Sequence, residues 1–263
     1  MKSGELIGLV GSNGAGKSTF IKILSTLIKP SSGDVFLDGR SIVKHLMVMQ
    51  KNIGYLPQEV AIYPNLSVVE FLMYLAALKK VTGKKAVEQV EVLLETLHLS
   101  DVRNKRLSDC SGGMKQRVGI AGALLGNPEI IVVDEATTGL DPEERVTLRN
   151  ILSKLACTKI VLLSTHIISD MEAAATRIMV LKRGNLLFDD TPEMMLHHAD
   201  GYVWEYILAD SRMCENLSGI SSMMQMEQGI KIRQVSAEKP FPEAVSVRAT
   251  LEDACLCVLE EVF

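Results

Sequence analysis

The sequence predicts an α/β fold built on a mainly parallel sheet, with helices between the strands and a small α+β appendage at the carboxyl end. Three continuous apolar runs carry the prediction: Leu6–Val10, Ile130–Val133 and Ile160–Leu163. Such runs are typical of strands that are buried on both faces of a parallel sheet. Helical patterns separate them, and alternation of this kind favours right-handed crossover connections.

Amphipathic segments predict the helices between the strands. They are Lys17–Ile28, Val68–Leu78, the stretch marked by Val87, Val90, Leu94 and Leu97, and the stretch that follows Asp141-Pro142. Ser67 and Glu70 form a capping-box pattern at the start of the second segment. Asp141 is expected to be an N-cap, because proline suits the first position of a helix.

The α/β rhythm stops near Thr191-Pro192-Glu193. Beyond it we expect short strands at Tyr202–Leu208, Gly229–Val235 and Val245–Val247, and a final helix that is capped by Thr250 and Asp253. The sequence therefore predicts an N-terminal domain over residues 1–190 and a small accessory region over residues 191–263.

Composition excludes several classes of protein. The chain has 263 residues, a formal net charge of −4 and 47% hydrophobic residues, which indicates a globular chain without the basic surface of a nucleic-acid-binding protein. It contains no run of 18 apolar residues, so we expect no membrane span of its own.

The cysteines and the one histidine pair suggest neither a disulfide framework nor a metal site. The five cysteines are Cys110, Cys157, Cys214, Cys255 and Cys257, and none forms a CxxC pair. This pattern favours a reducing cytosol. His197-His198 lacks a cysteine or acidic partner at ligand spacing, so we interpret it as a solvated helix end.

A phosphate-binding motif follows the first strand. Gly11-Ser12-Asn13-Gly14-Ala15-Gly16-Lys17-Ser18 matches GxxxxGK[ST], and it has the strand before it and the helix after it that the motif requires. Loop amides and the helix N-terminus would face the phosphates. Lys17 would reach the β- and γ-phosphates, Ser18 would bind Mg²⁺, and Thr19 would contact a neighbouring phosphate. The sequence thus predicts ATP and Mg²⁺ as cofactors.

A pair of carboxylates completes this site. Asp134 and Glu135 follow the Ile130–Val133 run, and ligand sites of open α/β sheets gather at the carboxyl ends of strands. Asp134 suits the magnesium coordination sphere. Glu135 could accept a proton from an attacking water.

Further motifs resemble those of the ATP-binding domains of ABC transporters. The segment Ser111-Gly112-Gly113-Met114-Lys115-Gln116-Arg117 resembles the signature motif of this family and begins 23 residues before Asp134. Gln58 resembles the Q-loop glutamine, Gly139-Leu140-Asp141 the D-loop, and Ser164-Thr165-His166 the switch histidine. The resemblance covers residues 4–190. Thr250–Ala254 also resembles the closing helix of drug and bacteriocin exporters.

The resemblance implies a P-loop ATPase with a helical signature subdomain that works as a head-to-tail dimer. Ser111, Gly112 and Gly113 would cap the γ-phosphate bound by the other subunit, where Asp141 would also lie. Gln58 would sense Mg²⁺ and the attacking water, and His166 would contact the γ-phosphate. The implied partners are a second ATPase subunit, identical or different, and a separate transmembrane permease, with no nucleic acid. The implied location is the cytoplasmic face of the cell membrane.

The chain departs from the family pattern in three places. Ten residues precede Gly11, whereas the family has two further strands and an aromatic residue that stacks on adenine. We therefore expect weakened adenine recognition, an unpaired edge near Val35–Leu37, and a Met1 that is an internal or misassigned start. Cys110 stands where the family has leucine, and Ala136 where it often has proline.

Two other functions compete with the energising subunit of a transporter. A soluble ABC ATPase that acts on ribosomes or DNA would carry two ATPase halves or a long inserted arm, and this sequence has one P-loop and one signature. A non-hydrolysing remnant is suggested by the short N-terminus, but Lys17, Asp134, Glu135 and His166 are all present. The transported substrate, its direction and the choice of homo- or heterodimer stay open.

Overall fold

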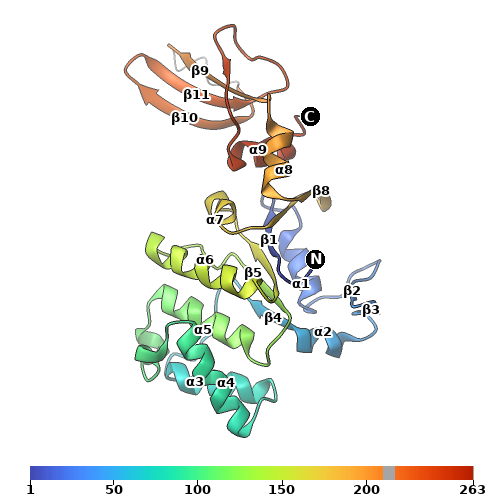
Figure 1. The fold of residues 1–263 in the computed structure, drawn as a ribbon, viewed down its shortest axis with the longest axis vertical. Helices are drawn as coiled ribbons and strands as arrows, with labels where there is room; N and C mark the ends of the chain where they lie inside the picture. The colour runs from blue at the N-terminus through green and yellow to red at the C-terminus, as the bar shows by residue number, and fades with distance from the viewer. Residues whose placement is uncertain (210–216, 263) are drawn as a thin grey trace. The chain divides into compact units, whose positions relative to one another are not determined.

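The computed structural model describes residues 1–209 and 217–262, so Cys214 lies outside the described part (Figure 1). The chain divides into two compact units. The first unit comprises Met1–Gly8 and Lys17–Thr165, and the second comprises Leu9–Gly16 and His166–Phe263. We describe each unit by itself.

The first unit contains the expected parallel sheet. Its strands run in the order β4 (Ile53–Leu56), β5 (Ile130–Asp134), β6 (Ile160–Ser164) and β1 (Leu6–Val10), although the last two residues of β1 belong to the second unit. Strands β4, β5 and β6 are parallel, and Val132 pairs with Tyr55 on one side and Leu162 on the other. The three apolar runs are therefore strands as predicted, and the α/β fold class is confirmed.

Six α-helices of the first unit are described. They are α1 (Lys17–Leu24), α2 (Leu46–Asn52), α3 (Val68–Leu78), α4 (Gly83–Thr96), α5 (Gly112–Leu124) and α6 (Pro142–Ala156), with short 3₁₀ turns at Ser100–Val102 and Leu107–Asp109. Helices α3, α4 and α5 pack against one another as a helical subdomain (Figure 1). The capping box of α3 is present as expected: the Ser67 amide donates to Glu70 Oε2 at 2.8 Å, and Ser67 Oγ accepts from the Glu70 amide at 3.4 Å.

Helix α1 is shorter than the sequence predicted. It ends at Leu24, not at Ile28, because Thr26 takes a left-handed backbone conformation with φ of 59°. The Leu27 amide then turns back to the Lys22 carbonyl at 2.8 Å, as at many helix ends. Leu27 is consequently 59% exposed, although the apolar pattern had placed it on a buried face.

The segment near Val35–Leu37 is not left unpaired. Strand β2 (Phe36–Leu37) pairs with β3 (Arg40–Ser41) in a two-stranded antiparallel hairpin, and the Ile42 amide donates to the Val35 carbonyl at 2.8 Å. The turn residues Asp38 and Gly39 both have positive φ, 48° and 73°. Asp-Gly is a strong signal for such a hairpin. The hairpin pairs one edge of β2, while the sheet ends at these two strands in the described part of the chain, so the expected open edge remains on the other side.

The second unit combines a hairpin with a small α+β region. In sheet order the end of β1 is followed by β7 (Arg177–Lys182) and β8 (Asn185–Asp190), which form an antiparallel hairpin. A separate antiparallel sheet has the order β10 (Ile220–Met226), β11 (Gly229–Val235), β9 (Val203–Leu208) and β12 (Val245–Ser246). The described helices of this unit are α7 (Ile168–Glu172), α8 (Pro192–Ala199) and α9 (Leu251–Glu260).

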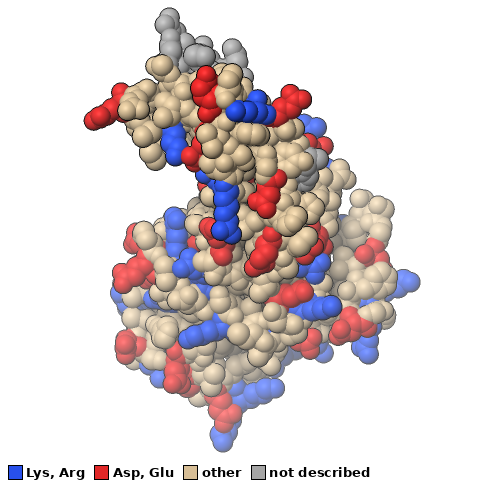
Figure 2. Space-filling view, turned by 45° about the horizontal axis from the view of Figure 1, so that its top comes forward, with Lys and Arg blue, Asp and Glu red and all other residues tan. Residues whose placement is uncertain are grey.

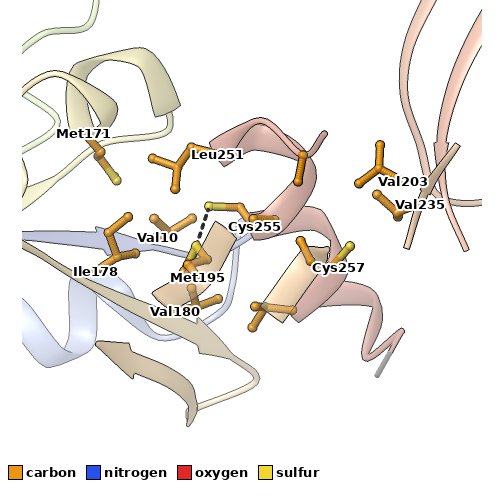
Figure 3. Packing of buried hydrophobic residues seen from close by; sticks show 14 residues of the cluster. Val10, Met171, Ile178, Val180, Met195, Val203, Val235, Leu251, Cys255 and Cys257 are labelled. Carbon is orange, nitrogen blue, oxygen red and sulfur yellow. Dashed lines mark hydrogen bonds between the residues drawn. The ribbon is translucent and has the colours of Figure 1, made fainter. Parts of the chain in front are cut away.

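One hydrophobic core joins most elements of the second unit (Figure 3). It contains Val10 from β1, Met171 from α7, Val180 from β7, Met195 from α8, and five residues of α9, which are Leu251, Ala254, Cys255, Cys257 and Val258. Burial raises the pKa of the Cys255 thiol to about 12 and that of Cys257 to about 11. Both thiols therefore stay protonated near neutral pH and pack as small apolar side chains.

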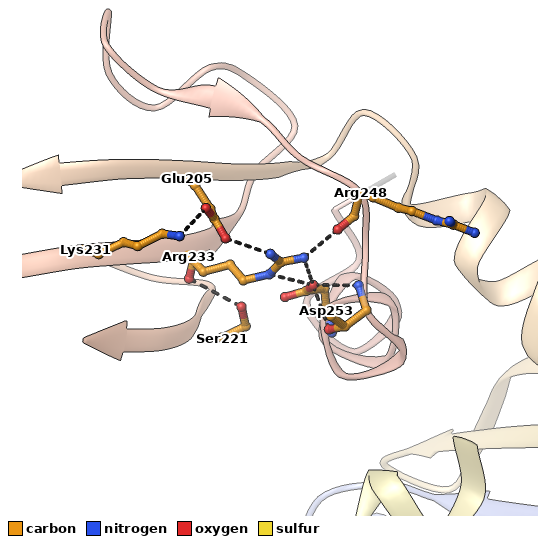
Figure 4. A network of polar contacts seen from close by, with 7 residues as sticks. Glu205, Ser221, Lys231, Arg233, Arg248 and Asp253 are labelled. Atoms are coloured by element: carbon orange, nitrogen blue, oxygen red, sulfur yellow. Dashed lines mark hydrogen bonds and ion pairs between the residues drawn. The ribbon is translucent and has the colours of Figure 1, made fainter. Parts of the chain in front are cut away.

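A polar network connects the small sheet to α9 (Figure 4). The Arg233 guanidinium lies 2.7 Å from Asp253 Oδ2 and 2.8 Å from Glu205 Oε1. Asp253 also completes the predicted capping box with Thr250. Burial raises the pKa of Asp253, but the bonds from Arg233 and Thr250 outweigh it and hold this pKa below its usual range. The network fixes the start of α9 against β11 and β9.

Charged side chains of both signs are interspersed on the face that Figure 2 shows, in keeping with the small net charge of −4. Across residues 1–209 and 217–262, none of the helices has the length and apolar character that a membrane span needs.

Candidate nucleotide site

The phosphate-binding loop lies in the second unit, where it leaves the end of β1. Gly14 and Gly16 have φ of 81° and 105°, values that glycine adopts without the steric cost that a Cβ atom would add. The Ala15 amide closes a tight turn onto the Ser12 carbonyl at 3.0 Å. Ala15 is buried, whereas Ser12, Asn13 and Gly14 are exposed.

This loop rests on the β7–β8 hairpin. The Gly184 amide donates to the Ala15 carbonyl at 2.8 Å. A Cβ atom on Gly11 would lie 2.5 Å from the Leu181 carbonyl oxygen, so only glycine allows the loop to approach β7 this closely. The hairpin turn itself, Arg183-Gly184, has two positive φ values. The sequence analysis missed this support, for which Gly184 in a two-residue turn was the available signal.

The chain passes directly from the loop into α1 of the first unit. Lys17 is the first residue of α1 and only 7% exposed, while Ser18 and Thr19 are exposed beside it. The first turn of α1 contains no acidic residue. The positive end of the helix dipole therefore favours an anion there.

Asp134 stands at the end of β5, close enough to Lys17 to feel its charge. Burial and the neighbouring Glu135 raise the pKa of Asp134, while Ser164, Tyr55 and Lys17 lower it less strongly. Ser164 lies opposite Asp134 in the β5–β6 pair, yet its buried hydroxyl forms no hydrogen bond of normal geometry. Burial and the Asp134 charge in turn raise the pKa of Tyr55.

Glu135 has an uncommon backbone conformation, with φ of 48°. Its amide donates to the Ser164 carbonyl at 2.9 Å, and its carbonyl accepts from the Thr138 amide at 3.2 Å. A glutamate held in the left-handed region stores strain that surrounding bonds must offset, and such residues cluster at functional sites. Other described non-glycine residues, such as Thr26 and Asp38, also have positive φ, so this conformation agrees with the motif at Glu135 and does not select that residue by itself.

We expect Asp134→Asn to stabilise the nucleotide-free protein at neutral pH. Folding raises the pKa of Asp134 above its unfolded value of 3.8. At a pH above the folded pKa, the ionised carboxylate therefore destabilises the folded protein. At a pH below 3.8 the carboxyl is protonated in both states, and this cost is absent. The rise in melting temperature should therefore be present at pH 7.5 and disappear as the pH falls toward 4. Thermal unfolding of wild type and variant across this range checks it; a gain that is constant with pH would contradict the electrostatic cause.

Gln58 follows β4 after one intervening residue, Pro57, and its side chain is exposed. Its carbonyl oxygen accepts a hydrogen bond from Gln116 Nε2 of α5 at 3.4 Å. Since β4 lies beside β5 in the parallel sheet, Gln58 and Asp134 follow the carboxyl ends of neighbouring strands. Gln58 thus connects the sheet edge to the helix of the signature motif.

The signature motif forms the start of α5. Ser111 is the N-cap, and its Oγ accepts from the Met114 amide at 3.2 Å. Ser111 and Gly112 are exposed, whereas a Cβ atom on the buried Gly113 would clash with the Glu144 carboxylate. Glu144 in α6 pairs with Arg117 of α5 at 2.6 Å. The structure therefore packs the signature helix against the helix that follows the D-loop.

Asp141 is the N-cap residue of α6, as expected, but its side chain forms no capping hydrogen bond. Its carboxylate is exposed at the start of the helix. The preceding Leu140 lies near the signature, since a Cβ atom on Gly112 would be 3.8 Å from Leu140 Cδ2. The structure thus brings the D-loop and the signature together within the first unit.

His166 lies in the second unit and is exposed. It lines a cavity of about 280 Å³ together with Gly11 and Ser12 of the phosphate-binding loop. Ile220, Glu252 and Cys255 of the carboxyl-terminal region line the same cavity. The second unit therefore places His166 and the phosphate-binding loop on one cavity, which residues of the carboxyl-terminal region also line.

The residues of the first unit fit a magnesium ion beside a phosphate. Ser18 offers a hydroxyl and Asp134 a carboxylate, and oxygen donors are the ligands that Mg²⁺ prefers. The Asp134 carboxylate is partly buried, and burial raises its pKa, so a cation beside it would offset the cost of burying its charge.

Comparison with known proteins gives the family. The ABC transporter family model matches residues 1–138. ATP-binding cassette sub-family A member 17 of Rattus norvegicus is 29% identical over 278 residues, which cover 99% of this chain and 16% of the rat protein. The chain thus spans a small part of the length of such a relative.

Solved structures agree with this assignment. CbiO1 from Clostridium perfringens, part of the ABC transporter complex cbiONQ, has a TM-score of 0.68 and 27% identity, covering 75% of this chain and 81% of that one. The ATP-binding cassette MJ0796, dimeric in a post-hydrolysis state with ADP and Pi, has a TM-score of 0.64 and 29% identity, covering 73% of this chain and 87% of that one. The chain therefore belongs to the ABC transporter family, as an ATP-binding domain of the kind that hydrolyses ATP.

Proposed function

We propose that this chain powers transport across a membrane, in the export direction, by hydrolysing magnesium-bound ATP while docked on a separate transmembrane partner at the cytoplasmic face. One observation carries the proposal. A buried lysine at a helix N-terminus stands within electrostatic reach of a paired carboxylate whose second member, Glu135, is held in a strained backbone conformation.

Binding rests on the backbone and on Lys17. The loop of Gly11, Ser12, Asn13, Gly14, Ala15 and Gly16 wraps around the phosphates, and Lys17 donates to their β- and γ-oxygens. Ser18 and Thr19 extend this set at the helix N-terminus. The buried position of Lys17 limits screening by water, which strengthens its interaction with a triphosphate.

Ser18, Asp134 and Gln58 hold the magnesium ion. Bound magnesium supplies positive charge against the phosphate oxygens. Asp134 must be ionised to bind it, and burial raises the pKa of Asp134. A bound cation would therefore stabilise the ionised form of Asp134, which burial alone disfavours.

Glu135 accepts the proton of the attacking water, and Gln58 orients that water. His166 donates to the γ-phosphate oxygen and keeps the loop and the phosphate together. The roles of Glu135 and His166 are proposed from geometry. Glu135 adjoins the proposed magnesium ligand Asp134, and His166 lines one cavity with Gly11 and Ser12. A base in this position accelerates a reaction by about 10²–10⁴-fold.

The catalytic unit is a dimer of ATP-binding domains, with an identical or a related chain. Ser111, Gly112, Gly113 and Asp141 act on the nucleotide that the other subunit binds. Their support is that Ser111, Gly112 and Asp141 are exposed at helix N-termini, where negative charge is favoured. The similar cassette MJ0796 was solved as a dimer. Residues 1–190 supply the ATPase, and residues 191–263 form an accessory region.

Mixing two inactive variants tests the shared site. Lys17→Met removes a phosphate contact, and Ser111→Arg blocks the signature. If each site combines the loop of one subunit with the signature of the other, a mixed dimer regains one intact site, and the mixture should hydrolyse ATP well above either variant alone. Phosphate release at rising ratios of the two variants measures this.

The control is the double variant Lys17→Met/Ser111→Arg mixed with the single variant Ser111→Arg, which offers no intact combination of loop and signature. Its activity should stay at background. A first mixture that is no more active than its components would contradict a site shared between two copies of this chain.

A further inference from the structure

Lys182 at the end of β7 is bound to the carboxyl end of α9. Its Nζ donates to the Leu259 backbone carbonyl and lies 2.8 Å from Glu261 Oε1. Leu259 belongs to the last turn of α9, where carbonyl groups have no partner within the helix. A lysine there satisfies a carbonyl and complements the helix dipole. The contact connects two elements that are 77 residues apart in sequence.

The next two residues form the turn on which the phosphate-binding loop rests. Lys182 pairs with Asn185 across the hairpin, so Arg183 and Gly184 make a two-residue turn. The Gly184 amide donates to the Ala15 carbonyl at 2.8 Å, and a Cβ atom on Gly16 would be 3.5 Å from Gly184 Cα. Moving the Lys182 end of the hairpin would therefore shift the support of Ala15 and Gly16.

Helix α9 is itself fixed with respect to the other end of the loop. Its residues Leu251, Cys255 and Val258 share a core with Val10, the residue directly before Gly11 (Figure 3). Arg233 and the capping box hold its first turn (Figure 4). The loop thus lies between two contacts with the same helix, one through Val10 and one through Lys182 and Gly184.

We propose that Lys182 is a positioning residue that uses the carboxyl-terminal helix α9 to hold the phosphate-binding loop in its nucleotide-binding conformation. The inference rests on the proposed function of that loop. It assigns to the end of the accessory region a direct part in ATP affinity. Lys182 does not touch the nucleotide; it acts through the hairpin turn and the Ala15 carbonyl.

The ion pair with Glu261 contributes little to this role. The Glu261 side chain is 63% exposed, and exposed pairs are screened by water and salt. Lys182 is 28% exposed, and its bond to the Leu259 carbonyl fixes the helix end directly. Glu261→Gln should therefore change ATP affinity little, whereas loss of the ammonium group should change it measurably.

The test compares ATP binding and hydrolysis by Lys182→Met, Lys182→Arg and wild type. Lys182→Met should weaken Mg-ATP binding about fivefold, as expected for one lost hydrogen bond of about 1 kcal/mol. KM for ATP should rise by the same factor, with kcat unchanged. Lys182→Arg should restore most of the affinity. Amide hydrogen exchange over residues 9–16 should speed up in Lys182→Met and not in Lys182→Arg.

Lys84→Met is the matched control. Lys84 pairs with Glu88 at 3.6 Å on α4, so the variant loses the same charge and an ion pair without touching the hairpin or α9. It controls for the weaker attraction of a less positive protein to ATP, and its affinity should stay within twofold of wild type.

Equal affinity of Lys182→Met and wild type would overturn the proposal, as would equal losses in Lys182→Met and Lys84→Met. If Lys182→Met does not fold, the Mg-ATP affinity of Lys182→Gln is compared with that of Lys182→Arg. The same difference of about fivefold is then expected between these two variants. Wild type that binds no Mg-ATP would instead overturn the proposed function. The two failures are therefore distinguishable.

Discussion

Glu135→Gln is expected to lower kcat for ATP hydrolysis by about 10²–10⁴-fold while Mg-ATP still binds. The amide cannot accept a proton, but it keeps the size and the hydrogen-bonding shape of the side chain. Removing the Glu135 charge also removes one cause of the raised pKa of Asp134, so the magnesium site should be at least as well ionised. Phosphate release, measured beside equilibrium binding of fluorescent ATP, separates the two effects.

Glu129→Gln is the matched control for this variant. Glu129 is exposed at the opposite end of the same strand, directly before β5. The same change in charge there should leave kcat near that of wild type. Hydrolysis by Glu135→Gln at the wild-type rate would show that another group accepts the proton.

Lys17→Met is expected to weaken Mg-ATP binding by about 100-fold, equivalent to about 2.7 kcal/mol. Charge-assisted hydrogen bonds are stronger than neutral ones, and this lysine is only 7% exposed, so water cannot replace it cheaply. At a concentration of 100 times its Kd, ATP should stabilise wild type by about 2.7 kcal/mol. At that same concentration Lys17→Met should show a small shift in melting temperature relative to its own nucleotide-free state.

Lys22→Met controls for the loss of one positive charge from the same helix. Lys22 lies in the last turn of α1 and is exposed, away from the helix N-terminus. Its ATP-induced shift should match that of wild type. A shift for Lys17→Met as large as for Lys22→Met would contradict a direct phosphate contact.

Much of the fold could be predicted because its signals are local. The apolar runs at Leu6–Val10, Ile130–Val133 and Ile160–Leu163 fill buried strands with little polar content. The capping boxes at Ser67 and Thr250 need only four consecutive residues each. Apolar runs and capping boxes are formed by residues that are neighbours in sequence, so they can be recognised from one sequence alone.

Other elements could not be predicted because tertiary contacts decide them. Strand β8 has only three consecutive apolar residues, Leu186, Leu187 and Phe188, and the two leucines are exposed, while β10 carries exposed methionines without a clear alternation. Helix α1 ends early because the backbone turns at Thr26, although the apolar pattern continues. Secondary-structure propensity and the hydrophobic pattern predict poorly at the edge strands of a sheet and at the ends of helices.

Some residues of the candidate site could be predicted from local motifs, and others could not. Motif spacing predicts Lys17, Asp134, Glu135 and His166 as site residues, since the proposed chemistry requires those residue types in that order. The supporting residues were not identified, because they come from distant segments with no motif of their own. Tyr55 and Ser164 act on Asp134. Gly184 and Lys182 act on the loop through the β7–β8 hairpin and α9.

Calorimetric titration of the purified chain with Mg-ATP tests whether the phosphate-binding loop and Asp134 together bind magnesium nucleotide. We expect saturable binding near one nucleotide per chain, much weaker binding when magnesium is chelated, and no measurable heat for Lys17→Met over the same range. Wild-type protein that is folded yet gives no heat with Mg-ATP would contradict this binding.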